Sequence, residues 1–368
     1  MKDFKYWKDL HDSDNLEEFN TDSVGLLWLK IKSIIRKELV ADFINQNVIV
    51  LEETALAKQF LELFVILSKN PSTSHKLLDN FIRIENVRQV QGLDTEKLVS
   101  ELYKLKIFDW GGDYQNSLDK YLVSQYVKVT KSYDTLISKF ETEINIAVQG
   151  YVLNSWYNHW TSILIEHIFK LHPAVLPTVG QIKSVDFFIN DIPFDLKVTY
   201  LPTEYIKLKR KEKGYPVELT YLKKKAGEAK ITFDKKGKPA DVYYEIVEKM
   251  KDRSDSFCKE TLQKLKDEKL EILKEVQDNP KMLSTWLYEN QGEMRFGSEN
   301  RLFLVLVNTD NFNSSWKLKR NIDLLKPTII SYLDNFHKKQ IENLSISFNF
   351  KGKSKTFTAL SDVIFVVK

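Results

Sequence analysis

The hydrophobic and polar positions follow a helical repeat over the first part of the chain. Apolar residues recur at intervals of three and four from Val24 to about Asn47, which is typical of an amphipathic helix. Further helices are predicted over 52–69, from Ser72 or Thr73 toward Ile84, and over 95–105. We therefore expect a mostly helical domain over residues 1–140. It would either pack as a support or contact DNA through a helix-turn-helix or winged unit.

The pattern changes after residue 140. A helical repeat from Glu141 to Leu171 leads into short apolar runs of the length of strands. Arg301–Asn308 is a continuous apolar run, as expected for a strand buried in a sheet between helices. The other expected elements are strands near 175–179, 184–189, 192–199, 217–222, 344–350 and 356–367, and helices over 241–277, 280–290 and 326–344. This order predicts an α/β domain over 141–368, a mixed sheet flanked by helices and ending in a C-terminal hairpin.

A β-hairpin is predicted around Asn190-Asp191. The apolar runs on either side, Val185–Ile189 and Ile192–Val198, have the length of strands, and the polar pair between them favours a tight turn. Alternate side chains of a strand leave opposite faces. One face of this hairpin can therefore anchor in a core while the other presents polar groups.

The polar face carries the candidate chemistry. Asp195 and Lys197 are two residues apart on one strand, so their side chains leave the same face. Asp186, on the partner strand, can reach that face. Two carboxylates and one ammonium on an otherwise apolar sheet indicate a site for a hard divalent cation, beside a lysine that can orient or activate water.

These residues resemble the motif of the PD-(D/E)XK nucleases, the restriction-endonuclease-like family. Its pattern is an Asp at the end of one strand, then Asp/Glu-x-Lys on the next, often with an acid on the preceding helix. Asp186 and Asp195-Leu-Lys197 match the two strand elements, and Glu166 lies where the helix acid is expected. The chain departs from the pattern at Val185, where the family often has Pro.

The resemblance implies a restriction-endonuclease-like core and a Mg²⁺-dependent endonuclease, for which Mn²⁺ would substitute. Asp186, Asp195 and Glu166 would hold the metal, and Lys197 would position the attacking water or stabilise the transition-state charge. The chain shows no motor or methyltransferase motif, so we expect a type II restriction enzyme that acts on double-stranded DNA as a homodimer. A repair or structure-specific nuclease, and a non-catalytic DNA- or protein-binding module on a nuclease-like core, are the alternatives.

Positive charge is concentrated in one segment. The net charge is +4, but Lys207–Lys238 holds twelve basic and four acidic residues, a net of +8. Such a segment after the candidate strand suits phosphate binding, and the alternative is a solvated loop. Arg301 could approach the phosphates from another edge, or form ion pairs with Glu289, Glu293 or Glu299. The residues expected to contact DNA are Lys209, Arg210, Lys223, Lys224, Lys225 and Arg295.

Composition changes this picture little. A chain of 368 residues with a hydrophobic share of 43% fits a globular protein of about two domains. The charged start lacks the apolar stretch of a secretory signal, and no apolar run is long enough for a membrane span, so we expect a cytoplasmic protein. Cys258 is the only cysteine, which excludes an internal disulfide. Gly352-Lys353-Ser354 lacks the preceding Gly of a phosphate-binding loop, because Ser347 is there, so we expect no nucleoside triphosphate.

Overall fold

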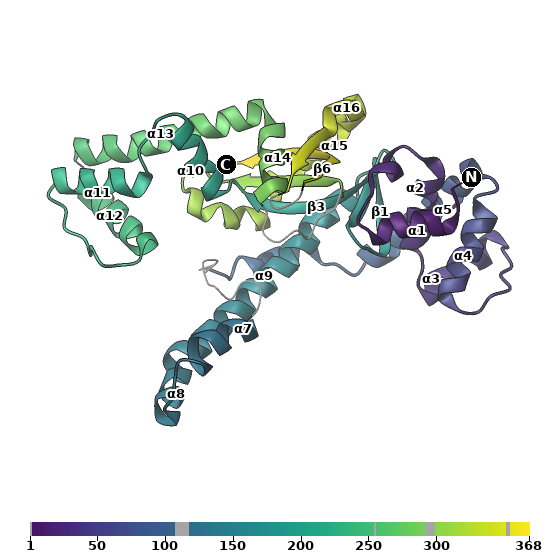
Figure 1. Ribbon diagram of the computed structural model, residues 1–368, viewed down its shortest axis with the longest axis horizontal. Helices are drawn as coiled ribbons and strands as arrows, with labels where there is room; N and C mark the ends of the chain where they lie inside the picture. Colours follow the sequence, from purple (N-terminus) through teal and green to yellow (C-terminus); the bar gives the residue numbers. More distant parts are fainter. Residues whose placement is uncertain (1, 107–117, 254, 291–298, 351–353) are drawn as a thin grey trace. The chain divides into compact units, whose positions relative to one another are not determined.

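A computed structural model gives the conformation of residues 2–106, 118–253, 255–290, 299–350 and 354–368. The strands form a mixed six-stranded sheet in the order β1-β2-β3-β4-β6-β5, flanked by helices (Figure 1). Two compact units are defined by the contacts within the chain. The first unit contains residues 1–7, 19–193 and 314–338, and the second contains 8–18, 194–313 and 339–368. The predicted α/β class is confirmed, whereas the units cut across the domain boundary expected at residue 140.

The first unit holds most of the N-terminal helices and two strands. Two short elements, α1 (Phe4–Asp12) and η1 (Glu17–Asn20), contribute residues to both units. The other elements of this unit are α2 (Ser23–Ser33), α3 (Lys37–Asn47), α4 (Leu56–Leu67), α5 (Pro71–Val90), α6 (Thr95–Leu102), α7 (Leu118–Leu122), η2 (Val123–Val127), α8 (Tyr133–Lys139), η3 (Phe140–Ile144), α9 (Asn145–Lys170), β1 (Val175–Ile182), β2 (Val185–Ile189), α15 (Ile322–Asn335) and η5 (Phe336–Lys338).

Two helix boundaries in this unit differ from those predicted. The single helix expected from Val24 to Asn47 is two helices, because Arg36 between them has an extended backbone (φ −136°, ψ 148°). The helix expected to begin at Ser72 or Thr73 is capped by Asn70, whose side chain accepts a hydrogen bond from the amide of Thr73. Pro71 then occupies the first helical position, where its missing N–H costs nothing.

The N-terminal helices pack directly on the strands. Both α2 and α5 contact β1, which is why the first 140 residues do not form a separate unit. The approach is closest at Gly180 of β1, where an added Cβ would lie 2.2 Å from the carbonyl oxygen of Ser33 at the end of α2. The hydroxyl of Ser33 also accepts a hydrogen bond of 3.3 Å from the amide of Val179. Glycine is therefore required at position 180 by the contact between helix and strand.

The turn between β2 and β3 (Ile192–Tyr200) has the predicted form. Asn190 and Asp191 both have positive φ, 47° and 66°, which is the signature of a type I′ hairpin turn. Lys30 of α2 is fully buried, and its ammonium contacts the carboxylates of Asp191 at 2.8 Å and Asp79 of α5 at 2.7 Å. The buried lysine thus ties the turn to the helices behind it.

The second unit is built on parallel strands. β4 (Arg301–Val307) pairs in parallel with β3 on one side and with β6 (Thr356–Val367) on the other, and β5 (Ser345–Asn349) runs antiparallel to β6. Every residue of β4 is buried, as its continuous apolar run predicted. The helices of this unit are α10 (Thr203–Glu212), α11 (Glu218–Glu228), α12 (Pro239–Arg253), α13 (Ser256–Asp278), α14 (Pro280–Asn290) and α16 (Ile341–Leu344), and η4 (Phe312–Arg320) joins the two units in sequence.

Two predictions for the C-terminal half are wrong. The segment 217–222, expected as a strand, is the start of α11 with its cap residue Val217, because Leu222 and Ala226 are spaced by four and pack into one buried helical cluster. The helical character predicted over 241–277 is confirmed, and the stretch holds α12 and α13, with Asp255 capping the second. The helix expected to open at Lys326-Pro327 begins earlier, capped by Asn321, and Pro327 lies inside it.

Candidate active site

Asp195 and Lys197 form an ion pair on β3. The Lys197 ammonium donates a hydrogen bond of 2.8 Å to Oδ1 of Asp195. This contact confirms that the two side chains leave the same face of the strand. The Asp195 side chain is 10% exposed and that of Lys197 is 40% exposed, so the carboxylate is held inside while the ammonium reaches solvent.

Arg301 completes this site and was not predicted as part of it. It is the register partner of Asp195 in the parallel β3–β4 pair, and its Nε lies 3.5 Å from Oδ2 of Asp195. Its Nη2 lies 3.4 Å from Oε2 of Glu299. Arg301 is 1% exposed, so the ion pair with Glu299 that the sequence left open is present, and a contact with DNA phosphates at the surface is excluded.

Tyr288 of α14 lies under the guanidinium. The Arg301 guanidinium carbon is 5.1 Å from the centre of the Tyr288 ring, and the Tyr288 hydroxyl donates a 2.8 Å hydrogen bond to the backbone carbonyl of Glu299. Burial raises the pKa of Tyr288 well above its ordinary value, so the phenol stays neutral. Its neighbours thus hold Arg301 in one position, and Arg301 in turn fixes the carboxylate of Asp195.

The two other predicted acids lie in the first unit. Glu166 of α9 accepts a 2.9 Å hydrogen bond from Lys170, one helical turn further on, and its side chain is 30% exposed. Asp186 lies in β2, where its backbone carbonyl accepts a 2.9 Å hydrogen bond from the hydroxyl of Thr178. Among the residues that the structure describes, no three His, Cys, Asp or Glu side chains gather closely enough to hold a metal ion.

The basic segment Lys207–Lys238 contains the end of α10, all of α11 and an irregular stretch over 229–238, and two of its predicted DNA contacts are internal. Lys209 is 5% exposed and pairs with Glu212 at 2.9 Å and Glu275 at 3.1 Å. Arg210 is 3% exposed and lies 2.7 Å from Glu268. Both cations are buried and already form ion pairs with carboxylates, so they cannot contact a DNA phosphate. The prediction that Lys209 and Arg210 contact DNA is therefore wrong.

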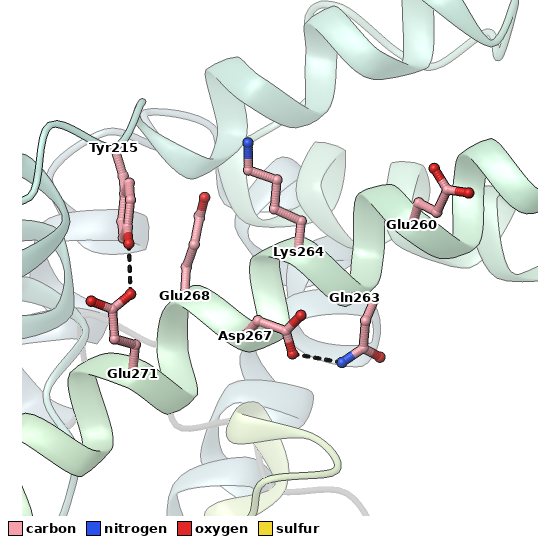
Figure 2. Close-up of a pocket in the computed structure, with 7 residues that line it drawn as sticks. All are labelled: Tyr215, Glu260, Gln263, Lys264, Asp267, Glu268 and Glu271. Atoms are coloured by element: carbon pink, nitrogen blue, oxygen red, sulfur yellow. Dashed lines mark hydrogen bonds between the residues drawn. The ribbon is translucent and has the colours of Figure 1, made fainter.

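An acidic groove on α13 lies beside this segment, and its carboxylates contact part of the segment's positive charge. The groove is lined by Tyr215, Gln263, Lys264 and four carboxylates of α13, those of Glu260, Asp267, Glu268 and Glu271. Figure 2 shows Tyr215 pointing toward Glu271, and Asp267 beside Gln263. The Tyr215 hydroxyl donates a 2.6 Å hydrogen bond to Glu271, and Lys213 contacts the same carboxylate at 3.0 Å. Hydrogen bonds from Tyr215 and Lys213 lower the pKa of Glu271, so it stays ionised. A DNA phosphate would be repelled here.

Two exposed lysines of α11 are the remaining candidates for DNA contact. Lys223 and Lys224 are exposed and form no ion pair with any residue of the described ranges. Lys225 is committed to Glu228 at 2.6 Å, and its ammonium lies 5.1 Å from the centre of the Phe257 ring. Arg295 lies outside the residues that the structure describes. Of the predicted DNA contacts that the structure describes, Lys223 and Lys224 remain available, and the prediction for Arg295 stays untested.

Comparison with known proteins gives no independent identification. Neither protein-family models, nor curated proteins, nor solved structures match this chain. Within the described ranges, no helix has both the length and the apolar character needed to cross a membrane. The chain is an α/β protein with a mixed six-stranded sheet, and its function has to be argued from the site itself.

Proposed function

We propose that this chain is a metal-dependent endonuclease that hydrolyses DNA, and most specifically a type II restriction enzyme. The observation that carries the proposal is the contact of 2.8 Å between Lys197 and Asp195 on β3. A half-exposed ammonium held by a buried carboxylate on a rigid strand is suited to positioning a water and to stabilising charge that develops on a phosphoryl group.

The order of elements supports the same proposal. Helix α9 precedes the strands β1, β2 and β3, further helices follow, and β4 then pairs in parallel with β3. This helix, strands, helix, strand order is the one that the resemblance to PD-(D/E)XK nucleases implies. The candidate residues Asp195 and Lys197 fall on the strand where that motif requires them.

Each residue of the site has a part in the proposed reaction. Lys197 would orient the attacking water or stabilise the transition state, and Asp195 would hold the lysine in place through their 2.8 Å contact. Arg301 would fix the position of the Asp195 side chain from the neighbouring strand. Hard oxygen donors suit Mg²⁺, and it is the resemblance that assigns this role to Asp195, Asp186 and Glu166. The ion, when bound, would act as a Lewis acid on the phosphate.

A non-catalytic DNA-binding module is the second candidate. The observation that favours it is that Asp195 lies between two cations, Lys197 at 2.8 Å and Arg301 at 3.5 Å. A carboxylate held between two cations in this way can serve only to stabilise the fold, as one partner in a set of ion pairs. Such a module would bind DNA through Lys223 and Lys224 but would not cleave it.

Cleavage of supercoiled plasmid DNA distinguishes the two. With Mg²⁺ or Mn²⁺ the wild-type chain should nick or linearise the plasmid, and EDTA should prevent this. Lys197→Met should lower the rate by about 10²–10³. Lys251→Met is the matched control, because Lys251 forms an exposed ion pair with Glu248 at 2.7 Å in the same unit, and it should cleave normally. DNA binding without metal-dependent cleavage would refute the nuclease and support the module.

A further inference from the structure

A pocket in the first unit is lined by none of the residues proposed for catalysis. It has a volume of about 790 Å³ and opens between α6, α9 and α15. Val99, Leu164 and Ile168 form part of its apolar wall. Pockets of this size and mixed character are typical of small-molecule sites.

Arg320 is the polar group that makes this pocket unusual. It is 5% exposed, and no carboxylate of the described residues lies within ion-pair distance of it. Its Nη1 donates hydrogen bonds of 2.6 Å and 2.7 Å to the carbonyls of Leu102 and Leu105, and its guanidinium carbon lies 4.6 Å from the centre of the Tyr103 ring. The Tyr157 and Trp316 rings also lie near it, at 5.8 Å and 5.2 Å, and its buried Nε has no hydrogen-bond partner among the described residues. Carbonyls and aromatic rings offset the charge of a buried guanidinium only in part, so an anionic ligand would be favoured here.

Two further nitrogen groups reach the same pocket from other helices. The buried Nδ1 of His167 on α9 has no hydrogen-bond partner in the described part of the chain. Burial lowers the pKa of His167, so the ring is neutral at pH 7 and one of its nitrogens can donate. Lys326 of α15 is exposed at the pocket and pairs with no described carboxylate.

The pocket also has two carboxylates, and their position determines which end of the pocket is negatively charged. Glu96 and Asp323 line it, and both are exposed. Within the described residues, the buried charge of this pocket is therefore positive, and the negative charges lie toward solvent. This arrangement selects a ligand whose anionic group is directed inward and whose other end carries hydroxyl or amino groups.

We propose that this pocket binds a small organic oxyanion, a carboxylate or a phosphate monoester. The anionic group would accept hydrogen bonds from Arg320, and a planar or aliphatic body would pack on Val99, Leu164 and Ile168. Lys326 and His167 would contribute further donors. The proposal is independent of the nuclease proposal, since it uses none of the residues assigned to cleavage.

Titration calorimetry on the full chain tests the proposal with three probes. Deoxyadenosine 5′-monophosphate represents phosphate monoesters, 2-naphthoate represents aromatic carboxylates, and deoxyadenosine is the neutral control. At least one anion should bind, and deoxyadenosine should bind at least about tenfold more weakly, since a hydrogen-bonded charge adds 1.4 kcal/mol or more. The anion that binds identifies the class. Absence of binding by both anions at millimolar concentration would refute the site.

Variants locate the binding in this pocket. Arg320→Gln keeps an amide donor for the Leu102 and Leu105 carbonyls but removes the charge, and it should weaken binding at least about tenfold. Lys317→Gln is the matched control, because this exposed lysine on η4 does not line the pocket, and it should bind as the wild type does. Val99→Trp should block binding by filling the pocket, and it remains informative if Arg320→Gln fails to fold. Unchanged affinity in Val99→Trp would place any binding elsewhere and overturn the proposal.

Discussion

Arg301 lies directly across from Asp195 in the parallel β3–β4 pair, and its Nε is 3.5 Å from the Asp195 carboxylate. Both side chains are largely buried, so this pair is screened little by solvent. The pair links the candidate site to the most buried strand of the second unit. A change at Arg301 should therefore affect both stability and the proposed activity.

Arg301→Met should destabilise the fold by about 3–5 kcal/mol, because it removes the buried cation that contacts the buried carboxylates of Asp195 and Glu299, although Asp195 keeps its contact with Lys197. Urea unfolding of the purified variant measures the change. Lys251→Met is the control, since Lys251 forms an exposed ion pair with Glu248 at 2.7 Å and its loss should cost about 1 kcal/mol or less. Equal decreases in the free energy of unfolding in the two variants would mean that the buried ion pairs of Arg301 stabilise the fold no more than an exposed pair does.

Neutralising Lys223 and Lys224 together should weaken binding to all DNA sequences alike. Each phosphate contact contributes about −0.9 to the slope of log K against log salt, so the double alanine variant should have a slope shallower by up to about 1.8. Site preference should persist, because phosphate contacts position a protein without reading sequence. Fluorescence anisotropy over a salt series measures the slope.

Lys225→Ala is the matched control on the same helix. Its ammonium is already paired with Glu228 at 2.6 Å, so its loss should change the slope little. A slope that is the same in the wild type and the double variant would mean that α11 does not contact DNA.

Because of Lys319, the free energy of unfolding should change with pH in the alkaline range. It is 5% exposed and bonded to Asn158 at 2.9 Å, and burial lowers its pKa to about 8 from 10.5. Between these two values the unfolded chain binds more protons than the folded chain, so the free energy of unfolding should rise as pH increases from about 8 to about 10.5. Below pH 8 the lysine is charged in both states and the dependence disappears.

Denaturant unfolding at several pH values tests this with Lys319→Met, which should lack that rise. Lys317→Met changes an exposed lysine on the same element and should keep it. Parallel pH curves for the wild type and Lys319→Met would contradict the assignment.

Gly180→Ala should destabilise the first unit. The new Cβ would meet the carbonyl oxygen of Ser33 at 2.2 Å, so α2 and β1 would have to separate, at a cost of about 1–3 kcal/mol. Gly92→Ala is the control, because nothing lies within 4 Å of its added Cβ. The control should leave the thermal midpoint unchanged or raise it slightly. A midpoint for Gly180→Ala equal to that of the wild type would show that the close contact is easily relieved.

Local patterns in the sequence determined several parts of this protein. The turn at Asn190-Asp191 was predictable because these residue types tolerate positive φ. The strand β4 was predictable because a strand covered on both faces needs a continuous apolar run. That Asp195 and Lys197 leave the same face followed from the two-residue repeat of a strand, and the structure adds that they form an ion pair. In each case the backbone geometry of a few neighbouring residues sets the outcome.

Tertiary structure alone decided which distant groups meet. Arg301 looked like a candidate for DNA contact, yet the β3–β4 register buries it against Asp195. Arg210 counted toward a basic surface, yet α13 places Glu268 beside it. The burial of Arg320 depends on the distant carbonyls of Leu102 and Leu105. Net charge and periodicity describe single segments, whereas burial and ion pairing depend on long-range packing, which a local pattern does not encode.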